Sequence, residues 1–328
     1  MKKNLSVDEM VKRLLAGDRR AAARLITLVE DEMDEHHEVM RQIFPHTGQA
    51  MILGITGAGG SGKSSLTDHL IHRFRARGKR VGVVVVDPSS PFSGGAFLGD
   101  RIRLQSHSQD DGVYIRSLAS RGYLGGLSRA TYDVIRIMEA MGNEVIIVET
   151  LGAGQDEIDI IHIAHTCLLV LTPGMGDDIQ AMKAGIMEIA DILVLNKADL
   201  DGASTSLRHL QGVLSAARCD EGEWIPRVVS TVSVADKPEN LKGIDELTAI
   251  IGEHQAHLRK TRTIEQLKFE RVEQELGLIF KDELEKLIFK SLKGTGKKKE
   301  YIASILERKN DPYSVVGEVL RTYLPSRE

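Results

Sequence analysis

Cysteine is scarce in this chain of 328 residues, which contains Cys167 and Cys219 and no Cys-x-x-Cys spacing. The shortage disfavours a disulfide framework of the secreted kind and a zinc site, and it fits a reducing cytoplasm. No run of about 18 apolar residues occurs, and the N-terminal residues lack a small-residue cleavage pattern. We therefore expect a soluble, cytoplasmic protein that is neither exported nor membrane-spanning.

An excess of one charge is also missing. The 43 basic and 47 acidic residues are interspersed along most of the chain and give a formal net charge of -4. Such a balance creates no overall field that would recruit nucleic acid or an anionic membrane surface. We expect neither as a partner, and partners must instead be recognised locally.

Short apolar runs recur through the middle of the chain, near residues 51–56, 81–86, 145–148, 167–171 and 192–195. They are rich in valine and isoleucine, and helical patterns separate most of them, which is typical of a parallel sheet covered by helices on both faces. Ligands of such sheets bind beyond the carboxyl ends of the strands. The sequence thus predicts an α/β fold, with the chemistry in the loops that follow the strands.

Helical patterns flank this α/β region, which we place at residues 49–258. Residues 1–48 predict two or three short helices, and residues 259–328 predict a helical arm. Within the arm, a long charged helix from about 264 to 292 carries an apolar stripe that a lone helix would leave exposed. We expect the stripe to pack on this chain or on a second copy. Its residues are Leu267, Val272, Leu276, Ile279, Phe280, Leu284, Leu287 and Ile288.

The stretch MILGITGAGGSGKSSLTDHLI, residues 51–71, combines a strand, the pattern G-x-x-x-x-G-K-S and a helix. In a phosphate loop (P-loop) of this kind, backbone N–H groups converge on phosphate oxygens and the positive end of the helix faces them. Lys63 would reach the outer phosphates, and the Ser64 hydroxyl would ligate Mg²⁺. A glycine turn before an ordinary helix is the simpler alternative, but it does not explain the lysine and the serine. The predicted nucleotide-binding residues are Gly57, Ala58, Gly59, Gly60, Ser61, Gly62, Lys63, Ser64 and Ser65.

Acidic residues follow two of the apolar runs and occupy one loop. Asp87 ends VGVVVVD, Glu149 ends EVIIVE, and Asp100 lies in SGGAFLGDR. Without the P-loop, a cap of the next segment would be the better explanation of each. Opposite a P-loop, however, they form the oxygen-rich cluster that Mg²⁺ and phosphoryl transfer require. We predict Ser64, Asp87, Asp100 and Glu149 as metal ligands.

The tetrapeptide NKAD, residues 196–199, follows the apolar run ILVL. The Asp199 carboxylate is suited to accept hydrogen bonds from guanine N1–H and its amino group, a pattern that adenine does not offer. Asn196 and Lys197 would brace the loop and cover the ring. Ser230 and Thr231, in VVSTVS, are further candidates for the base site, although a plain strand end explains them equally well. GTP is thus favoured over ATP.

These motifs together resemble the MeaB/ArgK GTPases, the metallochaperones of adenosylcobalamin-dependent acyl-CoA mutases. The similar blocks are TGAGGSGKSS, VDPSSPFSGGAFLGDRIR, SRGYLGGLSRAT, VETLGAGQDE, TPGMGDDIQAMKAG and ADILVLNKAD, in order from about residue 50 to 200. The resemblance implies a P-loop NTPase fold of the SIMIBI type and a homodimer in which the C-terminal arm makes the dimer. It also implies a GTPase that gates cobalamin delivery to a mutase, or protects and reactivates the mutase, and that the mutase stimulates.

The resemblance also assigns roles to individual residues. Lys63, Asp100 and Glu149 become catalytic, the two acids ordering water or metal at the γ-phosphate. The switch residues it implies are Gln155, Asp177, Asp178 and Lys183. An exposed helix start explains Asp177 and Asp178 without it, and a polar residue at a helix N-terminus explains Gln155 equally well. The chain has no cobalamin-binding DxHxxG motif, so no bound cobalamin is expected.

One segment departs from the family pattern, and two pairs of histidines could be mistaken for metal ligands. PFSGGAF, residues 91–97, lacks the arginine of the RTGGSI form of this switch, which leaves the regulatory chemistry open. The histidine pairs 36–37 and 162–165 match no metal-binding spacing and are interpreted as surface or packing residues. Two other functions are compatible with the motifs: a kinase acting on a transport-related protein or small molecule, and a non-catalytic GTP-binding assembly factor.

Overall fold

The structure is a computed structural model that describes residues 5–87, 105–107, 109–119, 129–150, 160–174, 190–216, 222–234, 237–261 and 263–323. The chain divides into two units, Met1–Phe269 and Glu270–Glu328.

A sheet of seven parallel strands forms the centre of the first unit, in the order β3-β2-β4-β1-β5-β6-β7. The predicted parallel sheet with flanking helices is confirmed. Strand β1 lies between β4 and β5. The chain runs from β1 to β2 toward one edge of the sheet and from β4 to β5 toward the other, so the strand order reverses beside β1 and marks this point as the expected ligand site. The strands are β1 (Met51–Thr56), β2 (Val81–Asp87), β3 (Val113–Ala119), β4 (Val145–Thr150), β5 (Thr166–Leu171), β6 (Ile192–Leu195) and β7 (Arg227–Ser230).

Strand β3 was not among the apolar runs found in the sequence. Its segment VYIRSLA contains Arg116 and Ser117, which interrupt the apolar pattern. In the fold β3 is an outer strand of the described sheet, and Arg116 hydrogen-bonds to Glu30 of the N-terminal helices. Arg116 is compatible with a strand here because its side chain is only partly buried and its charge is paired with the Glu30 carboxylate.

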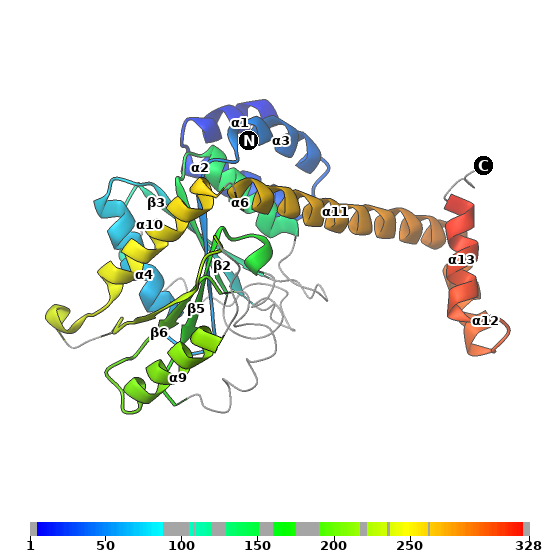
Figure 1. The fold of residues 1–328 in the computed structure, drawn as a ribbon. Coiled ribbons are helices and arrows are strands. Elements are labelled where there is room, and N and C mark those ends of the chain that lie inside the picture. Colours follow the sequence, from blue (N-terminus) through cyan, green and yellow to red (C-terminus); the bar gives the residue numbers. More distant parts are fainter. Residues whose placement is uncertain are drawn as a thin grey trace. The chain divides into compact units, whose positions relative to one another are not determined.

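One face of the sheet is covered by α4 (Lys63–Ala76) and α10 (Ile244–Lys260), which lie side by side (Figure 1). Alternate residues of the strands point at them, as the two-residue period of a strand requires. The fully buried side chains of this core include Leu53, Leu66, Leu70, Val83 and Leu247. Helix α4 starts directly after β1, so this packing fixes the position of the loop between them.

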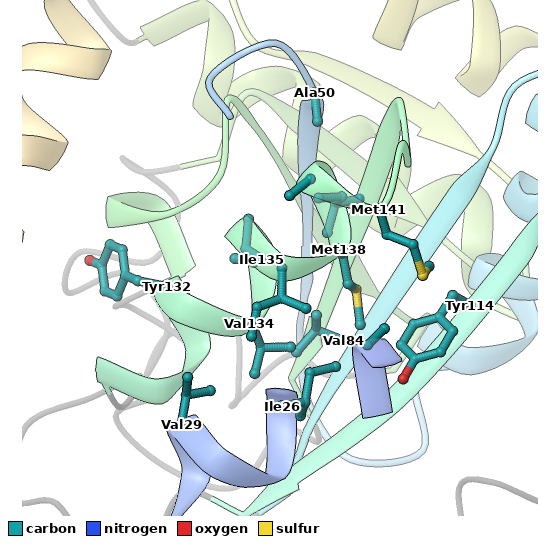
Figure 2. Close-up of a cluster of buried hydrophobic side chains, with 14 of the residues drawn as sticks. Ile26, Val29, Ala50, Val84, Tyr114, Tyr132, Val134, Ile135, Met138 and Met141 are labelled. Atoms are coloured by element: carbon teal, nitrogen blue, oxygen red, sulfur yellow. The ribbon is translucent and has the colours of Figure 1, made fainter. Parts of the chain in front are cut away.

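The other face is covered by α6 (Arg129–Ala140) and, beside β5 and β6, by α9 (Ala203–Ala216). Helices α1 (Val7–Leu15), α2 (Arg19–Glu30) and α3 (His36–Ile43) pack on α6 and share its core. Figure 2 shows Ile26 and Val29 of α2 in this core with side chains of α6. They confirm the predicted N-terminal helices. Four short 3-10 helices complete the described part of this unit: η1 (Phe44–His46), η2 (Gln105–His107), η3 (Ile160–His162) and η4 (Pro238–Asn240).

The second unit holds most of α11 (Thr263–Thr295), with α12 (Lys297–Leu306) and α13 (Pro312–Tyr323). Tyr301 Oη donates a hydrogen bond of 2.9 Å to Glu318 Oε1 between α12 and α13. The long helix predicted from about 264 to 292 is confirmed. Five side chains of its apolar stripe are exposed: Val272, Leu276, Phe280, Leu284 and Leu287. Every helix in the described part of the chain is too short or too polar to span a bilayer.

Candidate functional site

The loop between β1 and α4 has a shape that requires glycine at two positions. Gly57 has φ +138°, and a Cβ there would lie 2.2 Å from Val170 O. Gly62 has φ +94°, and its Cβ would lie 2.2 Å from Asn196 Nδ2. Residues other than glycine rarely adopt such φ values, and Val170 O and Asn196 Nδ2 leave no space for a methyl group at these two positions. The predicted P-loop therefore folds tightly against β5 and against the loop that follows β6.

Lys63 is the first residue of α4, and its side chain is buried. The Nζ atom donates hydrogen bonds to Gly57 O at 2.6 Å and to Ala58 O at 2.9 Å. The ammonium group thus folds back over the P-loop and lies at the positive end of the helix. Two sources of positive potential meet there, which is the arrangement that binds phosphate groups.

The Glu149 side chain, which is 1% exposed, comes from β4 and meets the first turns of α4. Ser64 Oγ donates to Glu149 Oε1 at 2.6 Å, and Thr67 Oγ1 donates to Oε2 at 2.7 Å. A buried carboxylate needs such donors to offset its lost hydration. Ser64, the predicted Mg²⁺ ligand, is therefore held directly against a predicted metal-binding acid. Thr67 was not singled out in the sequence, although it lies one turn beyond Ser64 on the helix.

The donor set at this point fits Mg²⁺, a hard ion that takes hydroxyl, carboxylate and water oxygens. Asp87 ends β2, which pairs with β4 in a register that aligns Val86 with Thr150. Its backbone therefore lies at the same edge of the sheet as Glu149. Asp100, a predicted ligand and catalytic acid, lies outside the described residues, as do the predicted switch residues Gln155, Asp177, Asp178 and Lys183.

Asn196, whose side chain is fully buried, joins three loops at the ends of β1, β6 and β7. Its Nδ2 donates to Ser61 O at 2.8 Å. Its Oδ1 accepts from Thr231 Oγ1 at 3.0 Å and from Ser233 N at 3.3 Å. Both ends of the amide are used, so Asn196 fixes the P-loop to the segment predicted to bind the base.

The remaining residues of that segment surround this contact. Lys197 has φ +55° and is exposed, as is Asp199. Thr231 is buried, and its hydroxyl is directed at Asn196, whereas Ser230 ends β7 and is half-buried. Thr231 thus braces the loop in this structure, and Asp199 remains accessible to a ligand.

Two serine hydroxyls near Asn196 are buried and have no hydrogen-bond partner within the described part of the chain: Ser61 Oγ and Ser233 Oγ. Buried hydroxyls normally find a partner, and exceptions cluster where a ligand or water completes the structure. Ser233 was not predicted from the sequence. Its Oγ would lie 3.4 Å from a Cβ at Gly62, which places it against the P-loop.

A polar pair lies at the opposite end of the sheet, where β5 and β6 begin; the His254 side chain is buried and the Asp191 side chain is partly buried. Asp191 Oδ2 accepts from Cys167 N at 2.7 Å, and His254 Nε2 lies 3.4 Å from Asp191 Oδ1. Burial raises the pKa of Asp191 to about 7, although the Cys167 N–H opposes this. Burial, aided by His257, lowers the pKa of His254 to about 4. Both shifts are in the direction that favours the neutral form, as expected when burial removes water from a titratable group.

Two of the histidines interpreted as packing residues are buried between elements. His36 Nε2 lies 2.8 Å from Asp133 Oδ2 of α6, and His165 Nδ1 accepts from Ile52 N at 3.0 Å. These contacts tie α3 to α6 and the start of β5 to β1, which supports the interpretation of both histidines as packing residues.

The chain is similar to known GTPases along most of its length. Residues 22–293 match the model of a family described as methylmalonyl Co-A mutase-associated GTPase MeaB. The chain is 46% identical over 317 residues to a protein of Pyrococcus abyssi named as a GTPase, covering 96% of each chain. It is 34% identical over 291 residues to the GTPase ArgK of Escherichia coli, covering 84% of this chain and 86% of that one.

A solved structure shares the fold. The crystal structure titled LAO/AO transport system kinase superposes with a TM-score of 0.71, at 23% identity, over 98% of this chain and 99% of that one. At this identity the likeness concerns the fold alone. It identifies the sheet and its P-loop as a P-loop NTPase fold, which confirms the predicted fold class.

Proposed function

The chain belongs to the MeaB family of methylmalonyl-CoA mutase-associated GTPases, and we propose that it binds and hydrolyses GTP as a chaperone of an adenosylcobalamin-dependent acyl-CoA mutase. In this role it gates cobalamin delivery to the mutase, or protects and reactivates the mutase. The observation that carries the proposal is the hydrogen bond from Asn196, the first residue of NKAD, to Ser61 O of the P-loop. One buried side chain thereby sets the distance between the phosphate site and the base site.

Within the proposed site, Lys63 and the N–H groups of the P-loop bind the outer phosphates, where negative charge must be stabilised during transfer. Asp199 selects guanine by accepting two hydrogen bonds from its edge, while Asn196 and Thr231 keep the loop in place. Glu149 orients Ser64 through the 2.6 Å hydrogen bond. Together with Asp100 it orders the attacking water, because positioning and electrostatics dominate this chemistry.

Magnesium, when bound with the nucleotide, would supply positive charge that offsets the negative charge of the phosphates. Ser64, Asp87, Asp100 and Glu149 are the residues that would hold it. Asp177, Asp178 and Lys183, with Gln155, form the proposed switch that the mutase orders. Cobalamin itself belongs to the mutase in this scheme, and the proposed location is the cytoplasm.

A homodimer is part of the proposal. Residues 1–48 form the helical extension, residues 49–258 the GTPase domain and residues 259–328 the dimerising arm. The exposed side chains of Leu276, Phe280, Leu284 and Leu287 recur every three or four residues along α11. An apolar stripe of this kind is stabilised when a second helix covers it. The arm of a second copy is the proposed cover.

Nucleotide specificity and turnover can be tested with the full chain alone. Phosphate release from GTP and from ATP is measured at matched Mg²⁺ concentration, with Lys63→Ala as the variant that lacks the phosphate-binding ammonium group. Slow GTP turnover that Lys63→Ala abolishes, with little ATP turnover, supports the proposal. Equal use of ATP would remove the role given to Asp199, and unchanged turnover in Lys63→Ala would remove the P-loop assignment.

A further inference from the structure

Three side chains outside the proposed nucleotide site converge beside α4. Asp68 and His72 belong to α4, and His107 belongs to η2. His107 Nε2 lies 2.8 Å from Asp68 Oδ1, and His72 Nε2 lies 3.8 Å from Asp68 Oδ2. One ligand atom from each residue lies within 4.8 Å of the other two. Within the described part of the chain, this is the one group of three or more His, Cys, Asp or Glu side chains that meets this condition.

The spacing of residues along α4 explains why two of the three side chains lie together. Residues four apart lie on the same face of a helix, so Asp68 and His72 project side by side. The third member comes from a segment more than 30 residues away along the chain, where Ser106 Oγ also donates to Asp68 Oδ1 at 2.9 Å. The rings of His72 and His107 are 4.5 Å apart. Each of the two carboxylate oxygens therefore faces one imidazole nitrogen.

We propose that Asp68, His72 and His107 form a binding site for a divalent transition-metal ion of the zinc type. Two imidazole nitrogens and one carboxylate oxygen suit zinc and its neighbours, whereas Mg²⁺ prefers oxygen ligands throughout. Three protein ligands leave a fourth position for water or for a further ligand. The site is separate from the one proposed for the nucleotide's Mg²⁺.

The distances suit such an ion. Ligand atoms about 2.0–2.2 Å from a tetrahedral zinc ion lie roughly 3.3–3.5 Å from one another. The distances of 2.8 Å and 3.8 Å end on different oxygens of Asp68, Oδ1 and Oδ2, so the Asp68 carboxylate and the His72 side chain must rotate to bring one oxygen and both nitrogens to this spacing. The three ligand atoms already lie within 4.8 Å of one another. The His72 side chain is 57% exposed and free to make that adjustment, whereas the His107 side chain is 3% exposed and anchors the site.

An ordinary hydrogen-bonded cluster would be the competing account. An Asp–His pair with a neighbouring imidazole stabilises η2 against α4 without any metal. The two accounts differ at His72, which is 3.8 Å from the carboxylate and too far for a hydrogen bond. His72 contributes little to a hydrogen-bonded cluster but is a full ligand of a metal site.

The test is titration of the nucleotide-free full chain with Zn²⁺ by calorimetry, in the presence of excess Mg²⁺. One Zn²⁺ per chain should bind, and Co²⁺ in its place should give the visible spectrum of a four-coordinate nitrogen- and oxygen-ligated site. His72→Ala should weaken binding by more than the roughly 10- to 100-fold that loss of an outer-shell partner costs. Ser106→Ala should fall within that range, because Ser106 contacts the ligand Asp68 rather than the metal.

The matched control is His209→Ala, which removes an exposed histidine on α9 and should leave Zn²⁺ affinity unchanged. Because His72 is exposed, its replacement by alanine should fold normally, and an unchanged thermal midpoint without metal checks this. Stoichiometric Zn²⁺ binding that survives in both His72→Ala and Asp68→Asn would overturn the proposal. Absence of Zn²⁺ binding by the wild-type chain would overturn it as well. The result does not depend on GTP hydrolysis, so it stands or fails separately from the proposed function.

Discussion

Replacement of Gly62 by alanine tests whether the P-loop depends on its contact with Asn196. Gly62 has φ +94°, and the added Cβ would lie 2.2 Å from Asn196 Nδ2. Asn196 cannot move aside freely, because its amide also holds Ser61, Thr231 and Ser233. The methyl group must therefore break the hydrogen bond between Asn196 and Ser61 or displace the loop.

The expected loss of stability has two parts. The left-handed backbone costs a side chain about 1–2 kcal/mol. Separation of Asn196 Nδ2 from Ser61 O leaves buried polar groups unpaired, at about 1–3 kcal/mol. Gly62→Ala should therefore lower the free energy of unfolding by about 2–5 kcal/mol. Gly60→Ala is the matched control, because Gly60 has φ +76° but no atom of the described residues lies within 4 Å of its added Cβ. It should cost only the first part.

Urea unfolding of both variants, followed by the fluorescence of the single tryptophan, Trp224, provides the measurement. Trp224 lies in the first unit, so the signal reports on the unit that contains the P-loop. GTP affinity, measured in parallel, should fall more in Gly62→Ala than in Gly60→Ala. Equal losses of stability in the two variants would refute the inference that Asn196 shapes the loop.

Three other substitutions have defined outcomes. Asp199→Ala should weaken GTP binding roughly 10- to 150-fold, because it removes a charged hydrogen bond of about 1.5–3 kcal/mol. ATP binding, measured in the same fluorescence titration, should not change. Unaltered GTP affinity would exclude a contact between Asp199 and guanine. Glu149→Gln removes the charge beside Ser64 and should reduce phosphate release roughly 10- to 100-fold while GTP still binds, so undiminished turnover would contradict the proposed role. Burial raises the pKa of Asp191 to about 7, so the folded protein keeps a proton that the unfolded chain loses near pH 4. The contribution of this group to stability therefore falls as pH rises from about 4 through 7. In Asp191→Asn the side chain stays neutral at every pH. Between pH 5 and 8 the variant's free energy of unfolding in urea should therefore rise by roughly 1–2 kcal/mol relative to that of the wild type; this value allows for the 32% exposure of the Asp191 side chain. Because both proteins contain His254, its opposite contribution cancels when their free energies of unfolding are subtracted. A difference between the two proteins that does not change from pH 5 to 8 would exclude a raised pKa of Asp191.

Local patterns were enough to predict much of the fold. The five apolar runs found in the sequence correspond to β1, β2, β4, β5 and β6, because strands buried on both faces have continuous apolar sequences. Strand β3 escaped notice because Arg116 breaks its pattern and forms a long-range contact with Glu30. No local rule predicts a contact between residues 86 positions apart.

In the candidate site, too, the local motifs were predicted from the sequence and the long-range contacts were not. The P-loop and NKAD were predicted from spacing, since their chemistry depends on neighbours in sequence. The link from Asn196 to Ser61 spans 135 positions, and the partners Thr67 and Ser233 follow from the packing of α4 and of the loop after β7. The cluster at His107 was missed for the same reason, although the Asp-x-x-x-His pair on α4 is visible in the sequence.

The most direct test of the proposed function is phosphate release from GTP as an adenosylcobalamin-dependent acyl-CoA mutase is added. The full chain is held at fixed concentration with saturating GTP and Mg²⁺, and the mutase is titrated with Lys63→Ala as the inactive control. A rate that rises and saturates with mutase concentration, and that Lys63→Ala lacks, is the predicted result. A rate that no acyl-CoA mutase changes would contradict the chaperone role.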